Sequence, residues 1–192
     1  MTIEIHPPAP PPARRARTPR GRTLTTGDGR RLLLRAINAD DVAALQRGFA
    51  RLTPEQVRQR IFHRMTELSS QAATNLAHVD PAAGAAFVAV DDEGEIRGEA
   101  RIHVDPAARD AEFALIVDPQ WLGVGVGGAL MRRLAEEARR RGLREIWGKV
   151  LSGNSQMLEF ASTLGARRES LPQEPDLVRV RIDLKRPLRR RR

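Results

Sequence analysis

Cysteine and tyrosine are both absent from this 192-residue chain, and aromatic residues make up only 4% of it. Without cysteine the chain cannot form disulfides or thiolate metal sites, and its four histidines are too scattered to indicate a metal site. No apolar run approaches the ~20 residues of a membrane span, and the N-terminus lacks the hydrophobic core of a signal peptide. We therefore expect a cytoplasmic protein that holds no metal and does not enter a membrane.

Positive charge is concentrated at the two ends of the chain, although the formal net charge of the whole is +9. Residues 1–23 contain five arginines against one glutamate, and residues 185–192 contain six basic residues, so residues 24–184 carry about −1. We interpret residues 1–22 as a disordered Pro/Arg-rich lead-in, 23–184 as one folded domain and 185–192 as a basic tail. Nucleic-acid binding beyond non-specific contacts of the ends is therefore disfavoured.

Hydrophobic periodicity predicts an α+β domain with a mixed, largely antiparallel sheet flanked by helices. Three helices are expected between a first strand at 31–37 and the next strand, and Asn38 or Asp40 would cap the first of them. Short, turn-like links join the next three strands and favour antiparallel pairing. The expected strands are 31–37, 85–90, 95–104, 109–117, 145–151 and 177–184, and the later helices are 126–141 and 154–164.

Residues 111–142 organise the chain, because an apolar strand there leads through a glycine-rich turn into a long amphipathic helix. Four glycines (Gly123, Gly125, Gly127 and Gly128) lie within six residues. Glycine lets backbone N–H groups approach a ligand closely, and a helix N-terminus adds unpaired donors and partial positive charge. This combination indicates a site for a phosphate group.

Two familiar phosphate loops fit this stretch poorly. The spacing Gly123-x-Gly125-x-x-Gly128 matches the dinucleotide fingerprint, but five residues separate the strand from the first glycine and no acidic residue ends the next strand. A Walker A loop is excluded because no Lys-Ser/Thr pair follows the glycines.

Residues 117–130, VDPQWLGVGVGGAL, resemble the acetyl-CoA loop of the GNAT N-acetyltransferase superfamily, whose pattern is Gln/Arg-x-x-Gly-x-Gly/Ala. Asn154, followed by a helix that ends in Leu-Gly-Ala, resembles the later motif of that family. Residues 52–55, 60–63, 111–113 and 154–159 are most similar to the GNAT domain of Pat-type protein lysine acetyltransferases. The resemblance implies the GNAT fold and acetyl-CoA as co-substrate, with no metal.

The resemblance also implies which residues hold the cofactor. Backbone N–H groups from Gly123 to Gly128 would bind the CoA pyrophosphate, the strand end would splay from its neighbour and hydrogen-bond the pantetheine arm, and Asn154 would contact the pantetheine or cap its helix. The expected cofactor-binding residues are Ile116, Val117, Leu122, Gly123, Val124, Gly125, Val126, Gly127, Gly128 and Asn154. The sequence departs from the family pattern at Leu122, where the family has Gln or Arg, and at Val124, which is often polar.

Acetyl transfer to an amine needs a general base, and Glu112 is the first candidate because it matches the catalytic glutamate of the family's lysine acetyltransferases. Glu99 and His103 on the preceding strand are lesser candidates and are expected at the surface. Many members protonate the leaving thiolate with a tyrosine, whose position here is about Ala161. Water, Ser155 or no enzyme group would then serve as the acid.

The leading hypothesis is an N-acetyltransferase that acts on a protein lysine. An acidic pocket lined by the early helices would instead favour a small-molecule amine as acceptor. An alternative hypothesis is a non-catalytic CoA-binding module, which is suggested by Leu122 and by the missing tyrosine. A homodimer is also left open as the state of assembly.

Overall fold

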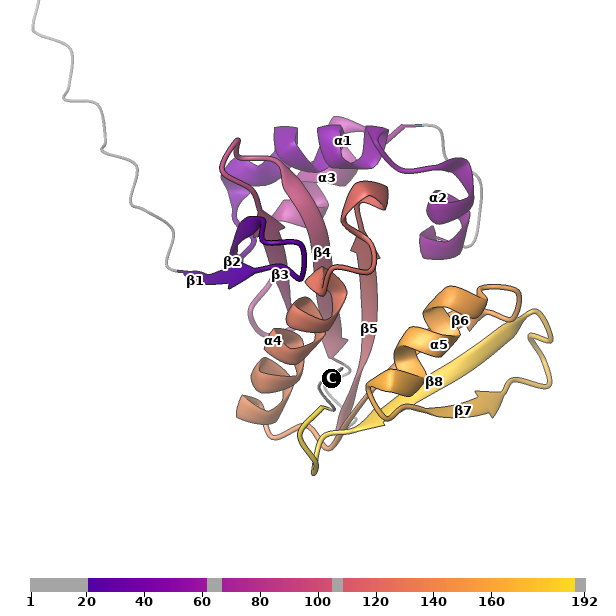
Figure 1. Ribbon diagram of the computed structural model, residues 1–192. Coiled ribbons are helices and arrows are strands. Elements are labelled where there is room, and N and C mark those ends of the chain that lie inside the picture. Colours follow the sequence, from indigo (N-terminus) through magenta and orange to yellow (C-terminus); the bar gives the residue numbers. More distant parts are fainter. Residues whose placement is uncertain (1–20, 62–66, 105–108, 189–192) are drawn as a thin grey trace, which may run out of the picture.

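A computed structural model of the protein describes residues 21–61, 67–104 and 109–188. These residues form an eight-stranded sheet in the order β1-β2-β3-β4-β5-β6-β8-β7 (Figure 1). The strands are β1 (Gly21–Thr25), β2 (Arg31–Ala36), β3 (Gly84–Val90), β4 (Ile96–Val104), β5 (Asp110–Val117), β6 (Glu145–Leu151), β7 (Arg167–Ser170) and β8 (Leu177–Asp183). All neighbours pair antiparallel except β5 and β6, which are parallel. The expected mixed, largely antiparallel sheet is confirmed.

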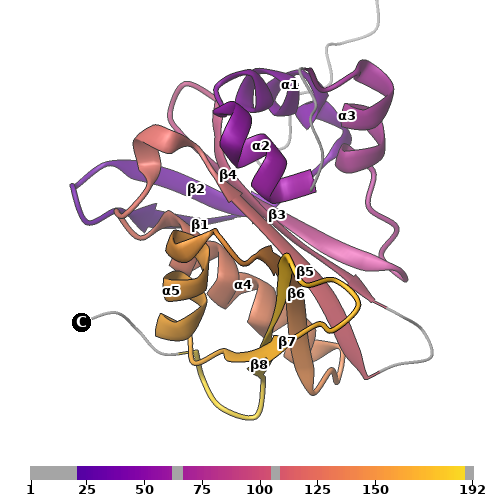
Figure 2. The ribbon, with the colours of Figure 1, turned by 90° about the vertical axis from the view of Figure 1, so that its right-hand side faces the viewer.

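Helices cover both faces of the sheet and make three layers. They are α1 (Val42–Ala50), α2 (Pro54–Ile61), α3 (Ser70–Ala77), α4 (Val126–Arg140) and α5 (Ser155–Thr163), with short 3-10 turns η1 (Ala39–Asp41) and η2 (Pro119–Trp121). The buried side of α4 packs with Phe87 and Ala100, whereas α1 packs on the other face with Val88 and Ile96. Figure 2 shows α1, α2 and α3 grouped together over the upper part of the sheet, away from α4 and α5.

Local capping chemistry explains where the early helices begin. The side chain of Asn38 accepts a hydrogen bond from the backbone of Asp40, and Asp41 completes a capping box at the start of η1, which leads into α1. Thr53 and Gln56 exchange side-chain and backbone hydrogen bonds at the start of α2.

The ends of the domain differ from the sequence prediction in two places. Gly21 and Arg22 belong to β1 rather than to an unstructured lead-in, and β7 was not foreseen. The beginning of the basic tail also packs on the domain, because Leu188 is buried and Arg139 donates a hydrogen bond to the carbonyl of Arg186. Residues 1–20 and 189–192 lie outside the described part of the chain.

The parallel pairing of β5 with β6 stops after three residue pairs. Asp110, Ala111 and Glu112 pair with β6, and the two strands then separate while β5 runs on to Val117. Gly148 is the residue of β6 that would continue the ladder opposite Phe113. A Cβ atom at Gly148 would lie 3.0 Å from the carbonyl oxygen of Phe113 and 3.1 Å from Cζ of its ring. Phe113 and Gly148 are therefore in close contact at the point where β5 and β6 separate.

Replacing Gly148 by alanine tests this contact. We expect Gly148→Ala to lower the free energy of unfolding by ~1–3 kcal/mol, because an added methyl group must displace a buried ring or a strand backbone. Gly153→Ala is the matched control, since a Cβ atom there meets nothing within 4 Å. Chemical denaturation of the two variants measures the difference, and equal stabilities would show that β5 and β6 do not need this close approach.

Candidate functional site

The glycine loop adopts a backbone that only glycine tolerates at two positions. Gly123 has φ of 76° and Gly125 has φ of 101°, both in the left-handed region. Gly125 is also the N-cap of α4, and because glycine has no side chain, the N–H groups of the first turn receive no capping hydrogen bond from it. These donors, together with the partial positive charge of a 15-residue helix, remain available for an anion.

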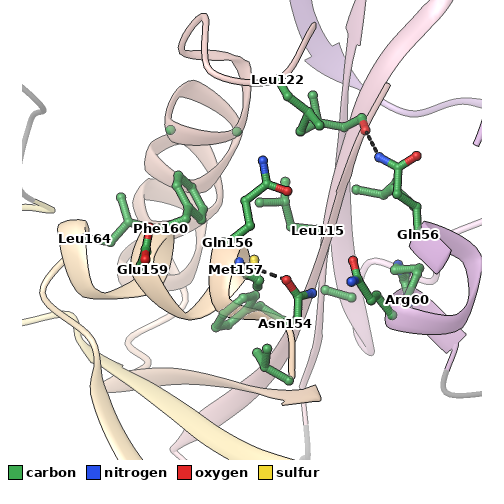
Figure 3. A pocket seen from close by; sticks show the side chains of 18 of the residues that line it. Gln56, Arg60, Leu115, Leu122, Asn154, Gln156, Met157, Glu159, Phe160 and Leu164 are labelled. Atoms are coloured by element: carbon green, nitrogen blue, oxygen red, sulfur yellow. Dashed lines mark hydrogen bonds between the residues drawn. The ribbon is translucent and has the colours of Figure 1, made fainter. Parts of the chain in front are cut away.

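One cavity of about 840 Å³ runs from this loop along β5, between α2 and α5 (Figure 3). Its floor is the edge of β5 from Glu112 to Val117, which the separation from β6 exposes. The glycine loop and the first turn of α4 form one end of it, and Gln56, Gln59 and Arg60 line it from α2. The cavity size is typical of a site for a small molecule or cofactor arm.

Most of the residues predicted from the sequence meet in this cavity. The ones that line it are Glu112, Ile116, Val117, Leu122, Gly123, Gly125, Gly127, Gly128 and Asn154. Val124 and Val126 do not line it: the Val126 side chain is fully buried in the core, and Val124 packs against the core. Only the backbone groups of these two valines could serve a ligand, as the resemblance implied.

Asn154 caps the helix that follows it. Its side-chain oxygen accepts a hydrogen bond from the backbone N–H of Met157, 3.0 Å away, at the start of α5 (Figure 3). Of the two roles left open by the sequence, helix capping is the one that the structure supports directly. Asn154 also lines the cavity, and its amide nitrogen remains a further donor there.

Glu112 is exposed at the end of the cavity away from the glycine loop, where β5 and β6 begin to separate. His103 lies opposite it on β4 and is exposed, as expected. Arg60 lies near Glu112: burial lowers the pKa of the Arg60 guanidinium, and the negative charges of Glu99 and Glu112 oppose that shift. The exposed carboxylate of Glu112 therefore lies within electrostatic range of the partly buried guanidinium of Arg60.

The expectation that Glu99 lies at the surface is wrong. Its side chain is buried and accepts a hydrogen bond of 2.6 Å from Arg101, and Arg60 lies 3.8 Å from its other oxygen. Both oxygens of Glu99 therefore face arginines, and the buried side chain is not presented to an incoming amine as a base would have to be. Glu99 faces α2, a helix about 40 residues earlier in the chain. The alternation of residues along β4 could not reveal that contact.

Asp118 anchors the segment between β5 and the glycines. Its buried carboxylate accepts hydrogen bonds from Arg51 at 2.8 Å, from Arg97 at 3.1 Å and from the backbone N–H of Gln120 at 3.0 Å. Although burial opposes it, hydrogen bonding to Asp91 and Asp118 raises the pKa of Arg97. The start of the loop is therefore fixed by a buried, fully charged network.

The turn between β1 and β2 supports the same loop from the other side. The backbone N–H of Gly27 donates to the carbonyl of Val124 at 2.9 Å, and Arg30 donates to the carbonyl of Gln120 at 3.0 Å. The guanidinium of Arg30 lies 3.6 Å from the centre of the buried Trp121 ring. A hydrogen bond from Arg30 holds the pKa of Asp28 at about 2, so this turn keeps its ion pair at neutral pH.

Sequence reasoning missed the polar side of α2. The side chain of Gln56 donates a hydrogen bond of 3.3 Å to the carbonyl of Val117, which ties α2 to the end of β5 (Figure 3). Gln59 and Arg60 lie three and four residues after Gln56, so the three side chains share one helix face. That spacing was the available signal in the sequence.

The comparisons with known proteins agree with this arrangement. The family model "Acetyltransferase (GNAT) family" matches residues 44–166. The GNAT domain of S. lividans PAT is 26% identical, with a TM-score of 0.78 over 85% of this chain and 96% of that one. An acetyltransferase of Pseudomonas aeruginosa is 28% identical over 160 residues, which cover 82% of this chain and 86% of that protein. Spermidine N-acetyltransferase from Vibrio cholerae, solved with CoA and spermine, shares the fold at 21% identity, with a TM-score of 0.66 over 80% of this chain and 96% of that one.

The separated pair of parallel strands beside a glycine loop agrees with these matches, which identify the class of the protein as an acetyltransferase. The family match covers most of the chain, and the chain belongs to the GNAT acetyltransferase family. It is therefore an N-acetyltransferase that uses acetyl-CoA. No helix within the described residues is long and apolar enough to cross a membrane, and their His, Asp and Glu side chains form no cluster that could hold a metal.

Removing the Arg30 side chain tests the support of the loop. If the glycine loop binds the cofactor as predicted, we expect Arg30→Ala to weaken acetyl-CoA binding about 3- to 10-fold, because the loop loses a hydrogen bond and a cation–π contact that hold it in place. Calorimetric titration gives the dissociation constant, and Arg31→Ala, which removes an exposed arginine next in sequence, is the control. Equal affinities of both variants and the wild type would show that the turn does not preorganise the loop.

Proposed function

We propose that the protein transfers the acetyl group of acetyl-CoA to the side-chain amine of lysines in protein acceptors, with Glu112 as general base. The observation that supports this most strongly is the course of the cavity, which begins at the glycine loop and ends at an exposed carboxylate. One end suits the phosphates of CoA, and the other end offers a base to an amine that arrives from solvent.

The cofactor would lie along the opened edge of β5. Backbone N–H groups of the glycine loop and of the first turn of α4 would donate to the pyrophosphate. The backbone of residues 113–117, which has no ladder partner in β6, would hydrogen-bond the amides of the pantetheine arm. Leu115, Met157 and Phe160 give the cavity apolar walls beside that arm.

The reaction would proceed by direct attack. The amine nitrogen forms a bond to the acetyl carbonyl carbon while its proton passes, directly or through water, to the carboxylate of Glu112. The tetrahedral intermediate then collapses, the carbon–sulfur bond breaks, and the electron pair leaves with the CoA sulfur. The ionised form of Glu112 is the one required for this role, because only a carboxylate can accept the proton of the amine.

The leaving thiolate would take its proton from water. The chain has no tyrosine, and Ala161, near the position where many relatives have one, is buried. A thiolate is a tolerable leaving group without a dedicated acid, because it is a much weaker base than the alkoxide or amide anions that other acyl transfers release. Loss of the tyrosine therefore slows the final protonation without preventing the transfer.

The charges of the cavity favour a protein acceptor over a small polyamine. The early helices contribute Gln56, Gln59 and Arg60, none of them acidic, to its wall. A polycation such as spermine needs several carboxylates to offset its charge, and the acids that line this cavity are Glu112 and Glu159, against Arg60, Arg132 and Lys149. A single lysine amine presented by a protein surface needs only the base.

The Glu112→Gln variant tests the proposed base together with the acceptor. With isotope-labelled acetyl-CoA and a dialysed protein mixture, we expect the wild type to label lysine side chains and Glu112→Gln to do so at least about tenfold more slowly. The dissociation constant for acetyl-CoA should stay within about twofold, because Glu112 lies away from the glycine loop. Mass spectrometry of the peptides measures the rates.

Glu67→Gln makes the same chemical change at an exposed residue outside the cavity and should keep the wild-type rate. An unchanged rate for Glu112→Gln would assign the base to another group. Label that appears on added spermidine but not on protein would instead identify the enzyme as a small-amine acetyltransferase.

A further inference from the structure

The loop that holds the CoA phosphates has no basic side chain of its own. Residues 118–128 contain neither lysine nor arginine, and Leu122 in the middle of the loop is an exposed apolar side chain. CoA carries three phosphate groups, each with at least one negative charge at neutral pH. Backbone N–H groups can donate to the pyrophosphate, but they carry only partial charge. A full positive charge must come from outside the loop.

Arg132 is one helical turn after Gly128 on α4 and lines the cavity. A Cβ atom at Gly128 would lie 3.2 Å from Nη1 and 3.9 Å from Cζ of Arg132, so the guanidinium lies against the bare first turn of the helix. The contact brings a delocalised cation next to the N–H groups that face the loop. A guanidinium can donate two parallel hydrogen bonds to one phosphate.

Two other cations line the cavity. Lys149 is paired with Glu174 at 2.7 Å, and Arg60 lies between Glu99 and Glu112 at the end away from the glycine loop. Arg132 is the cation of the cavity wall that lies against Gly128 of the glycine loop.

We propose that Arg132 binds a phosphate group of CoA and supplies the full positive charge that the glycine loop lacks. This inference rests on the proposed use of the cavity for acetyl-CoA. Gly128 serves the same purpose, because the absence of a Cβ atom lets the guanidinium lie close to the helix end. Either the pyrophosphate or the 3′-phosphate could be the group that Arg132 contacts, since both are phosphate esters.

Calorimetric titration with CoA and with dephospho-CoA, which lacks the 3′-phosphate, tests the proposal. We expect Arg132→Gln to weaken CoA binding about tenfold or more. A similar loss with dephospho-CoA would assign Arg132 to the pyrophosphate, and no loss with dephospho-CoA would assign it to the 3′-phosphate. Arg133→Gln removes the same charge from the next residue of α4, which lies over the Phe87 ring, and should bind CoA like the wild type.

Gly128→Ala is a second variant, which distinguishes a loss of CoA binding from a loss of folding. Alanine favours a helix, so thermal stability should not fall, yet its Cβ atom must displace the guanidinium and weaken CoA binding severalfold. Arg132→Gln binding CoA within twofold of the wild type would overturn the proposal. Failure of the wild type itself to bind CoA would instead refute the proposed function, so the two failures are distinguishable.

Discussion

Separation of β5 from β6 is the constraint on which the rest of the structure depends. A parallel ladder that continued beyond Glu112 would satisfy the backbone of β5 and leave no edge for a ligand. Instead the strands part where Phe113 faces Gly148, and one continuous cavity extends from the glycine loop to Glu112. Helix α5 covers β6 and its neighbours on the α4 side, and α2 is tied to the end of β5 by Gln56. Glu112, the proposed base, and the glycine loop thus lie at opposite ends of the same strand.

Charged residues far from the glycines hold the loop in place. Asp118 joins Arg51 and Arg97 beneath it, and Arg30 joins it to the turn between β1 and β2. This division of roles explains how the loop can contain Leu122 and Val124 without losing its shape. The loop itself offers backbone donors, the supporting arginines are used for structure, and the proposed ionic contact with the cofactor comes from Arg132. Ordering the loop before the ligand arrives lowers the entropic cost of binding.

The sequence predicted what local patterns encode, and it missed what distant contacts decide. The antiparallel strands, the long helix α4 and a cap at Asn38, one of the two candidates, follow from short-range signals and are confirmed. The glycines form a turn directly before α4, and its use as a phosphate site stays a prediction. β1 and β7 are short and largely exposed, so their pairing depends on neighbours rather than on their own composition. Burial of Glu99 and the stacking of Arg30 on Trp121 each need a partner more than 30 residues away. Such contacts produce no periodic pattern in the sequence from which they could be predicted.

Hydrogen–deuterium exchange with and without acetyl-CoA tests the central claim most directly, because it reports on backbone N–H groups. The account predicts that acetyl-CoA slows exchange in two segments, the glycine loop with the first turn of α4 (residues 123–129) and the open edge of β5 (residues 113–117). Exchange in β1, β2 and β3 outside the turn that supports the loop should change little. Protection confined to other segments, with both of these unaffected, would contradict the claim that the separated strand and the glycine loop together hold the cofactor.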